Sequence, residues 1–219
     1  QQMLVGSGQR ELGRVKLELG QLREADACLS EAEKILRAGQ NRKELAATLL
    51  VRASAFAELQ KPDAAHAALE ESYSILEDQG IRDLVPQYFL LRGRVELLSP
   101  TGDLESARNF LERGLVEIRE MSLPELRARI EYQLGVVEER QGDSRMADIH
   151  FREAQATLQD LFQSLAPELR GSFYRLRERE VIRTRARAAP EPPTVTAAPE
   201  PPRADAGVSI PADAAETTR

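Results

Sequence analysis

Histidine and cysteine, the residue types that most often supply metal ligands and nucleophiles, are scarce: the 219 residues include two histidines and one cysteine. His66 and His150 lie 84 residues apart, whereas paired zinc-binding histidines are expected about three to five residues apart, with carboxylate or cysteine support. Cys28 has no nearby base or electropositive group that would make it a nucleophile. Phosphate-binding, kinase and hydrolase motifs are missing from the sequence. We therefore expect no catalysis, metal site or cofactor in these residues.

A run of arginines between positions 170 and 187 is the strongest concentration of charge. Only Glu178 and Glu180 interrupt it, and its members are Arg170, Arg175, Arg177, Arg179, Arg183, Arg185 and Arg187. Such a run can bind an acidic partner, an anionic membrane or nucleic acid. We favour a solvated face of a terminal helix. The whole chain has a net charge of -6, and this argues against nucleic acid as the main partner, because phosphate binding needs a basic surface.

The composition favours closely stacked helices. Hydrophobic residues make up 42% of the chain and aromatic residues 5%, with no Trp, which suits a core of Ala and Leu better than a β-sandwich. A single cysteine excludes an internal disulfide and fits a reducing, cytoplasmic compartment. No apolar run reaches the roughly 18 residues of a transmembrane helix, so we expect no membrane partner. The start, Gln1-Gln2-Met3, leads us to expect a piece of a longer protein.

Two stretches of the chain repeat one pattern of small and apolar residues at identical spacings. The first contains Leu12, Gly13, Gly20, Ala25, Leu29 and Ala32, and the second contains Leu134, Gly135, Gly142, Ala147, Phe151 and Ala154. The pattern resembles the tetratricopeptide repeat (TPR), a pair of helices joined by a turn. The first glycine lets the second helix approach closely, and the second ends the first helix with positive φ. Leu12, Val15 and Leu19 share one face of the first helix.

Two weaker copies lie between them. The second repeat contains Ala53, Ala65 and Leu69, and the third contains Gly93, Gly102, Ala107 and Leu111. The repeats span about 6–39, 43–79, 84–120 and 124–160, and their turns at 20, 60, 102 and 142 are separated by 40, 42 and 40 residues. The common TPR period is about 34 residues, so this chain is similar to the longer variants in kinesin light chains and in sensor regions of large bacterial regulators. The resemblance implies an all-α, right-handed superhelical solenoid of TPR-like helix-turn-helix repeats.

Two further segments follow the repeats. Residues 161–187 are predicted to form a C-terminal capping helix, in which a short helix opens at Pro167 and carries the apolar residues Leu169, Phe173 and Leu176. Residues 188–219 hold seven of the twelve prolines and two copies of Ala-Pro-Glu-Pro-Pro, which predict a disordered Pro/Ala-rich tail. That tail suits a spacer or a ligand for a proline-recognising module.

The TPR resemblance also implies a binding site. Neighbouring first helices of such an array line a concave groove that binds segments of partner proteins. The groove positions implied here are Arg10, Arg14, Leu17, Ala47, Leu50, Ser54, Leu90, Arg94, Leu97, Arg129, Tyr132 and Val136. Arginines among apolar residues indicate an extended or helical partner segment with acidic groups. Co-chaperone TPRs hold a terminal carboxylate with two asparagines, but Arg14 and Val51 stand at the matching positions, so we exclude that partner.

These observations predict a non-catalytic protein–protein interaction module, the sensor or scaffold region of a larger bacterial regulatory protein. Two alternatives stay open. In one, the chain is the C-terminal regulatory arm of a Ser/Thr kinase or an AAA-type ATPase regulator, because the stretch from Leu165 to Phe173 is similar to the closing segment of such sensor regions. In the other, it is a structural TPR protein that pairs with a second copy through the degenerate second repeat or the open N-terminal face.

Overall fold

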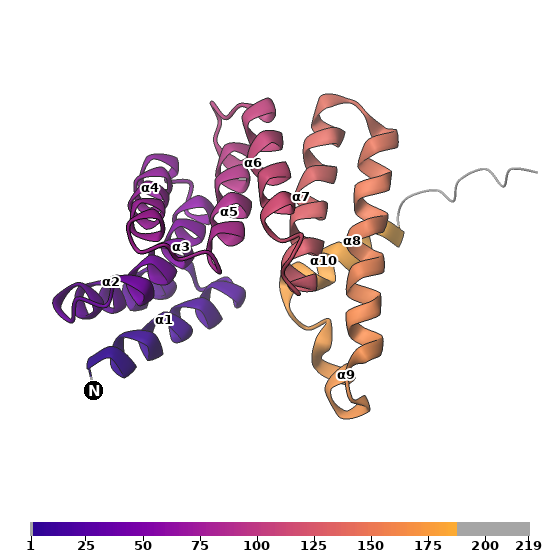
Figure 1. Cartoon of the computed structure of the whole chain (residues 1–219). Helices are drawn as coiled ribbons and strands as arrows, with labels where there is room; N and C mark the ends of the chain where they lie inside the picture. Colours follow the sequence, from indigo (N-terminus) through magenta and orange to yellow (C-terminus); the bar gives the residue numbers. More distant parts are fainter. Residues whose placement is uncertain (1, 188–219) are drawn as a thin grey trace, which may run out of the picture. The chain divides into compact units, whose positions relative to one another are not determined.

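A computed structural model describes residues 2–187, which form ten helices and contain no strand (Figure 1). The predicted all-α class is therefore confirmed for this part of the chain, and the predicted tail at 188–219 lies outside the described residues. The first eight helices form four consecutive pairs: α1 (Gln2–Glu18) with α2 (Leu22–Ala38), α3 (Arg42–Glu58) with α4 (Pro62–Asp78), α5 (Val85–Leu98) with α6 (Leu104–Glu117), and α7 (Pro124–Gln141) with α8 (Ser144–Ser164). Two shorter helices follow, α9 (Pro167–Phe173) and α10 (Arg177–Arg187).

The two helices of each pair make their most extensive contacts with each other. Each pair then packs on the next through α2 and α3, α4 and α5, and α6 and α7. The first helices also touch in series, α1 with α3, α3 with α5, and α5 with α7. This is a repeat-like helical arrangement, in which most contacts join elements that are neighbours in the sequence (Figure 1).

Local sequence signals explain where the helices begin and end. Asn41, Asp103 and Asp143 cap α3, α6 and α8 by accepting backbone N–H hydrogen bonds. Proline stands in the first turn of α4, α5, α7 and α9, where its missing N–H costs little. Gly20 and Gly142 follow first helices with φ of 73° and 89°, the left-handed conformation that glycine adopts without strain.

Close approach of the two helices within a pair explains the other repeated glycine. A Cβ atom on Gly13 would lie 2.7 Å from Cγ of Leu29, and one on Gly93 would lie 2.6 Å from Cγ of Leu111. A Cβ atom on Gly135 would likewise lie 2.6 Å from the ring of Phe151. The repeated spacing of glycine and a large apolar residue therefore corresponds to a helix–helix contact that leaves no room for a side chain.

The core follows the predicted stripes of the second helices. Buried members of the repeat pattern are Gly13, Ala25, Leu29, Ala32, Ala53, Ala65, Leu69, Gly93, Ala107, Leu111, Leu134, Gly135, Ala147, Phe151 and Ala154. Gly20 and Gly142 are exposed at turns, and Gly102 is half-buried in the connection before α6. Leu12, by contrast, is exposed together with Val15 and Leu19, the face that these three residues were predicted to share.

The segment after the repeats differs from the single capping helix predicted for 161–187. Helix α8 continues to Ser164, and the chain then forms two helices separated by a turn at residues 174–176. The turn separates the predicted apolar stripe, so Phe173 is buried while Leu169 and Leu176 are exposed. Ile182 of α10 is buried instead, in one cluster with Ala128 of α7 and Leu158 of α8.

Candidate functional site: a groove along the first helices

The first helices of the four pairs line one cavity together with the N-terminal half of α10. Its volume is about 380 Å³, which falls within the range of typical ligand pockets, about 300–1,000 Å³. Because α1, α3, α5 and α7 touch in series, their side chains form a continuous floor across all four pairs. We call this cavity the groove.

Ten of the twelve predicted groove residues line this cavity. They are Arg14, Leu17, Leu50, Ser54, Leu90, Arg94, Leu97, Arg129, Tyr132 and Val136. Leu50, Leu90 and Leu97 are buried and form an apolar floor. Arg10 and Ala47 are not among the lining residues.

The groove has a positive excess on an acidic chain. Six arginines and four glutamates line it, whereas the chain as a whole has a net charge of -6. The arginines are Arg14, Arg94, Arg129, Arg140, Arg177 and Arg179, and the glutamates are Glu18, Glu58, Glu125 and Glu178. An apolar floor bordered by guanidinium groups favours an amphipathic ligand with acidic groups.

Glu178 of α10 forms ion pairs with two arginines of the groove, Arg94 and Arg129. Its Oε1 atom lies 2.9 Å from Nη1 of Arg94, and its Oε2 atom lies 2.6 Å from Nε of Arg129. Arg94 also contacts Glu58 of α3. All of these side chains are less than one-third exposed, so water screens their ion pairs only in part. Sequence reasoning missed this contact: Glu178 was noted only as an interruption of the arginine run.

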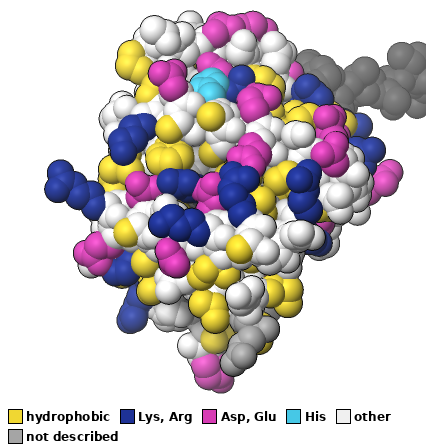
Figure 2. Space-filling model, turned by 90° about the vertical axis from the view of Figure 1, so that its left-hand side faces the viewer, with side chains coloured by type: hydrophobic (Ala, Val, Ile, Leu, Met, Phe, Trp, Pro, Cys, Tyr) yellow, Lys and Arg dark blue, Asp and Glu magenta, His cyan; other side chains and the backbone are white. Residues whose placement is uncertain are grey.

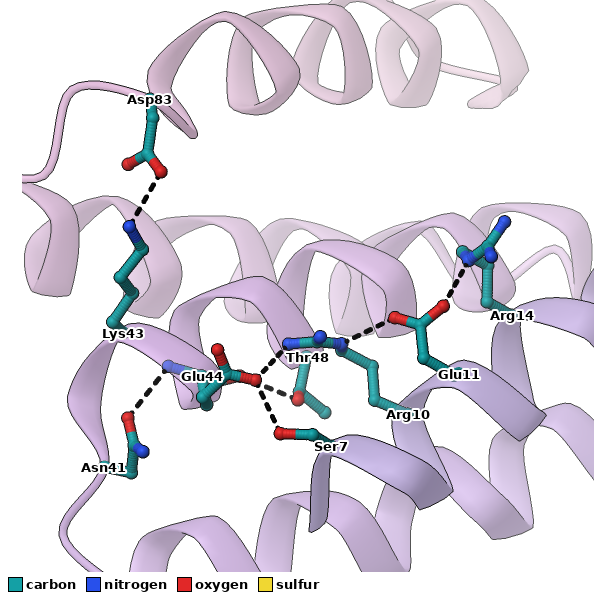
Figure 3. A network of polar contacts seen from close by, with 9 residues as sticks. All are labelled: Ser7, Arg10, Glu11, Arg14, Asn41, Lys43, Glu44, Thr48 and Asp83. Carbon is teal, nitrogen blue, oxygen red and sulfur yellow. Dashed lines mark hydrogen bonds and ion pairs between the residues drawn. The ribbon is translucent and has the colours of Figure 1, made fainter. Parts of the chain in front are cut away.

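Arg10 belongs to a different polar network, which joins α1 to α3 (Figure 3). Its Nη1 atom lies 2.6 Å from Oε2 of Glu44, and that oxygen also accepts a hydrogen bond of 2.7 Å from the Ser7 hydroxyl. Glu11 accepts from both Arg10 and Arg14, at 3.2 and 2.8 Å. The four predicted arginines, Arg10, Arg14, Arg94 and Arg129, therefore each have a carboxylate partner within the chain.

Glu18, at the end of α1, is a second acidic group that sequence reasoning did not assign to the site. Burial raises the pKa of its carboxyl, and the negative charge of Glu178 raises that pKa further. Arg129, Arg14 and Arg94 oppose both effects. Of the four carboxylates that line the groove, the one on α10 thus disfavours the ionised form of the one on α1.

The arginine run at 170–187 is not simply the solvated face that we favoured from the sequence. Arg179 makes a two-pronged ion pair with Glu125 of α7, at 2.8 and 2.7 Å, and its guanidinium lies 4.3 Å from the centre of the Phe173 ring. Arg170 donates to the carbonyl oxygens of Gln163 and Leu165. Several of these arginines therefore fasten α9 and α10 to α7 and α8.

The face of the molecule at the α1–α4 end carries basic, acidic and hydrophobic side chains (Figure 2). Basic and acidic groups lie next to one another across the middle of that face, and hydrophobic side chains are exposed between and below them (Figure 2). On this face, acidic and basic groups thus lie side by side (Figure 2).

The histidines and the cysteine lie outside the groove. His150 Nδ1 lies 2.8 Å from Oε2 of the buried Glu131, and burial followed by the charge of Arg92 lowers the pKa of His66. Cys28 is half-buried. Among the described residues, no three His, Cys, Asp or Glu side chains are arranged to hold a metal ion.

A second cavity, of about 660 Å³, lies between the connection from α6 to α7 and the C-terminal half of α8. It is lined by Leu115, Ile118, Arg119, Met121, Ser122, Leu123, Pro124, Arg127, Glu131, Thr157, Asp160, Leu161 and Ser164. Its buried carboxylate, Glu131, already pairs with His150. The lining therefore presents no buried acid that needs a ligand.

No protein-family model matches the chain, and a search of curated proteins finds no similar sequence. Within residues 2–187, no helix combines the length and the apolar character that crossing a membrane requires.

Proposed function

We propose that this chain is a non-catalytic protein–protein interaction module whose groove binds a segment of a partner protein. The observation that carries the proposal is the groove itself, which the first helices of four pairs line and which combines a buried apolar floor with a guanidinium-rich border. Extended or helical segments fit such sites, because apolar side chains reach the floor while polar ones meet the border. The partner is a protein segment with acidic groups.

The same proposal includes the family. A TPR-like solenoid of right-handed superhelical form explains the serial packing of the helix pairs, the glycines at close approaches and the turn spacing near 40 residues. A sensor or scaffold region in a larger cytoplasmic bacterial regulator fits such a module. The likeness of the stretch from Leu165 to a regulatory arm of a kinase or ATPase remains a hypothesis from the sequence.

Capture from a native lysate tests the groove. The full chain serves as bait beside a groove variant, Arg14→Glu with Ser54→Trp, which reverses one charge and fills part of the cavity. The control variant, Lys34→Glu with Ala27→Trp, makes the same kinds of change on the exposed surface of α2. We expect a partner that is retained by the wild-type and control chains and lost by the groove variant. A partner retained equally by all three chains would overturn the groove as the binding site.

A second candidate function, self-association, is favoured by the outer face of α1. Leu4, Leu12, Val15 and Leu19 are exposed along this helix, and exposed apolar patches often mark interfaces. The degenerate second repeat offers less, because Arg52 faces α2, where it pairs with Asp26 and Glu33.

Sedimentation velocity over a range of concentrations tests self-association. We expect a dimer that Leu12→Glu with Val15→Glu abolishes, and that Val116→Glu, a change at an exposed apolar residue of α6, leaves intact. A monomer at every concentration would remove this candidate.

A further inference from the structure

Helix α10 lines the groove with two residues that lie one helical turn apart. Glu178 enters the groove and bridges Arg94 and Arg129, while Ile182, four residues later, is buried against Ala128 of α7. Residues at i and i+4 lie on one face of a helix. One face of α10 therefore carries a carboxylate that pairs with groove arginines and an apolar group that is buried against α7.

We infer that α10 is a built-in competitor for the groove, and that the partner binds by replacing it. The partner segment that fits is an amphipathic helix with a carboxylate in the position of Glu178 and a large apolar residue four positions later. This inference rests on the proposed function and names the ligand chemistry and the regulation of that same site. Release of α10 exposes the guanidinium groups of Arg94 and Arg129 to the incoming carboxylate.

Charge complementarity supports this choice of occupant. Arg94 and Arg129 come from α5 and α7, and in the described structure Glu178 is a carboxylate that both of them contact. Arg129 has no other ion pair among the described side chains, so losing Glu178 without replacement leaves a partly buried guanidinium unpaired, which is unfavourable. A partner carboxylate removes that cost.

Several contacts of α10 are partly exposed to water. Glu178 is 31% exposed, and its partners Arg94 and Arg129 are 17% and 27% exposed, so water reaches both ion pairs. Arg177, next to Glu178, is mostly exposed and lies 3.8 Å from Glu58, a weak surface contact. Only Ile182 of α10 is fully buried among the residues whose side chains are described. Besides Glu178 and Ile182, Arg179 of α10 pairs with Glu125 and Arg185 pairs with Glu139, and a competing helix with the same charges can reproduce these contacts.

The test uses the full chain and a labelled peptide with the sequence of residues 172–187 of this protein. In the ejected variant, Glu178→Arg with Arg179→Glu and Ile182→Asp, α10 loses its ion pairs with the groove arginines and with Glu125, together with its buried apolar side chain. We expect the wild-type peptide to bind this variant with a Kd about tenfold or more below that for the wild-type chain, because the intramolecular competitor is gone. A peptide that carries Glu178→Gln is expected to bind about tenfold more weakly than the wild-type peptide.

A milder variant provides an independent measurement by amide hydrogen exchange. In the full chain with Glu178→Gln, we expect exchange in α10 to accelerate about tenfold while α3 to α7 stay unchanged. Unchanged exchange in α10 would overturn the inference, because Glu178 would then not hold the helix. Equal peptide binding by the wild-type and ejected chains, or no binding by the ejected chain, would overturn it as well.

A further variant shows where the peptide binds. The ejected chain that also carries Arg94→Glu and Arg129→Glu should lose the peptide, and retention would place the peptide elsewhere and overturn the inference. Failure of the proposed function is a separate result. It would appear in the lysate experiment as a partner that the Arg14→Glu with Ser54→Trp variant retains as well as the wild type does. That result does not depend on whether the peptide binds.

Discussion

The two ends of the helical array differ in whether further helices cover them. At the C-terminal end, α9 and α10 cover the last pair, where Phe173 and Ile182 are buried in a cluster with Ala154 and Leu158 of α8. At the N-terminal end, the outer face of α1 has no cover in the described structure, and Leu4, Leu12 and Leu19 are exposed. The same kind of helix pair thus has one closed end and one open end.

Equivalent positions make this comparison quantitative. Val15 of α1 is 47% exposed, whereas Ala55, Val95 and Val137, at the corresponding positions of α3, α5 and α7, are at most 2% exposed. The helix pair that precedes each of those three accounts for the difference. A residue in such an array is therefore buried by its neighbouring pair rather than by its own, as expected when each repeat contacts only adjacent repeats.

The largest expected effect comes from shortening matched leucines at the two ends. Leu134 and Leu12 occupy the same position of the repeat pattern, but they are 2% and 46% exposed. We expect Leu134→Ala to lower the free energy of unfolding by about 2–5 kcal/mol, because it leaves a cavity in the core. Leu12→Ala should change it by less than about 0.5 kcal/mol. Urea unfolding followed by circular dichroism measures both values.

Equal losses for the two leucine variants would contradict the comparison. That result would mean that a second copy or another segment covers Leu12 in solution. Repeating the unfolding at several protein concentrations separates these cases, since a dimer makes apparent stability depend on concentration.

Two glycines, one at a helix–helix contact and one on the outer face of α1, extend the comparison with a smaller effect. A Cβ at Gly93 would meet Leu111 at 2.6 Å and the Ala107 carbonyl oxygen at 3.0 Å, whereas a Cβ at Gly8 of α1 meets nothing within 4 Å. We expect Gly93→Ala to destabilise the chain by about 1–3 kcal/mol through overpacking. Gly8→Ala should stabilise it by about 0.5–1 kcal/mol, because alanine is the better helix former.

Thermal and urea unfolding show whether each glycine substitution raises or lowers the free energy of unfolding. Stabilisation by both substitutions would mean that α5 and α6 are not in close contact at Gly93. Destabilisation by Gly8→Ala would mean that the outer face of α1 is covered.

The sequence predicts the contacts within a helix pair well, because those contacts recur at a fixed spacing. Gly13 with Leu29 and Gly135 with Phe151 are examples, and the structure has both close approaches. The helical period also predicts which residues share a face, as it does for Leu12 and Val15. Periodicity cannot say which other element covers that face, so it leaves the exposure of α1 undetermined.

The sequence predicts most residues that line the groove, but it does not predict that α10 enters the groove. Ten groove positions follow from the repeat register, since first helices of consecutive pairs must lie side by side. The contact between Glu178 and Arg94 joins residues 84 positions apart. No local pattern encodes such a pair, and the turn at 174–176 that directs α10 toward the groove has no glycine or proline to indicate it.

The smallest expected effect lies where the two ends of the array meet, at Glu18 of α1 and Glu178 of α10. The raised pKa of Glu18 means that its protonated form is favoured in the folded chain. The protonated carboxyl of Glu18 therefore contributes to the stability of the fold. This contribution is fully present below the ordinary pKa of 4.5 and is lost as the pH rises through the raised pKa of the folded chain. Glu18→Gln keeps the neutral form at every pH, so the variant should gain stability over the wild type at neutral pH.

Melting curves at about pH 3.5, below the ordinary value of 4.5, and at pH 7 measure this gain. We expect Tm of the Glu18→Gln chain to equal that of the wild type at the lower pH and to exceed it by less than about 2 °C at pH 7. Glu31→Gln, at an exposed site on α2, is the matched control and should show no such difference between the two pH values. A lower Tm for Glu18→Gln at pH 7 would mean that the three arginines of the groove outweigh Glu178 at this position. The ends of the array would then attract rather than repel each other, and α10 would be held more firmly than a displaceable helix requires.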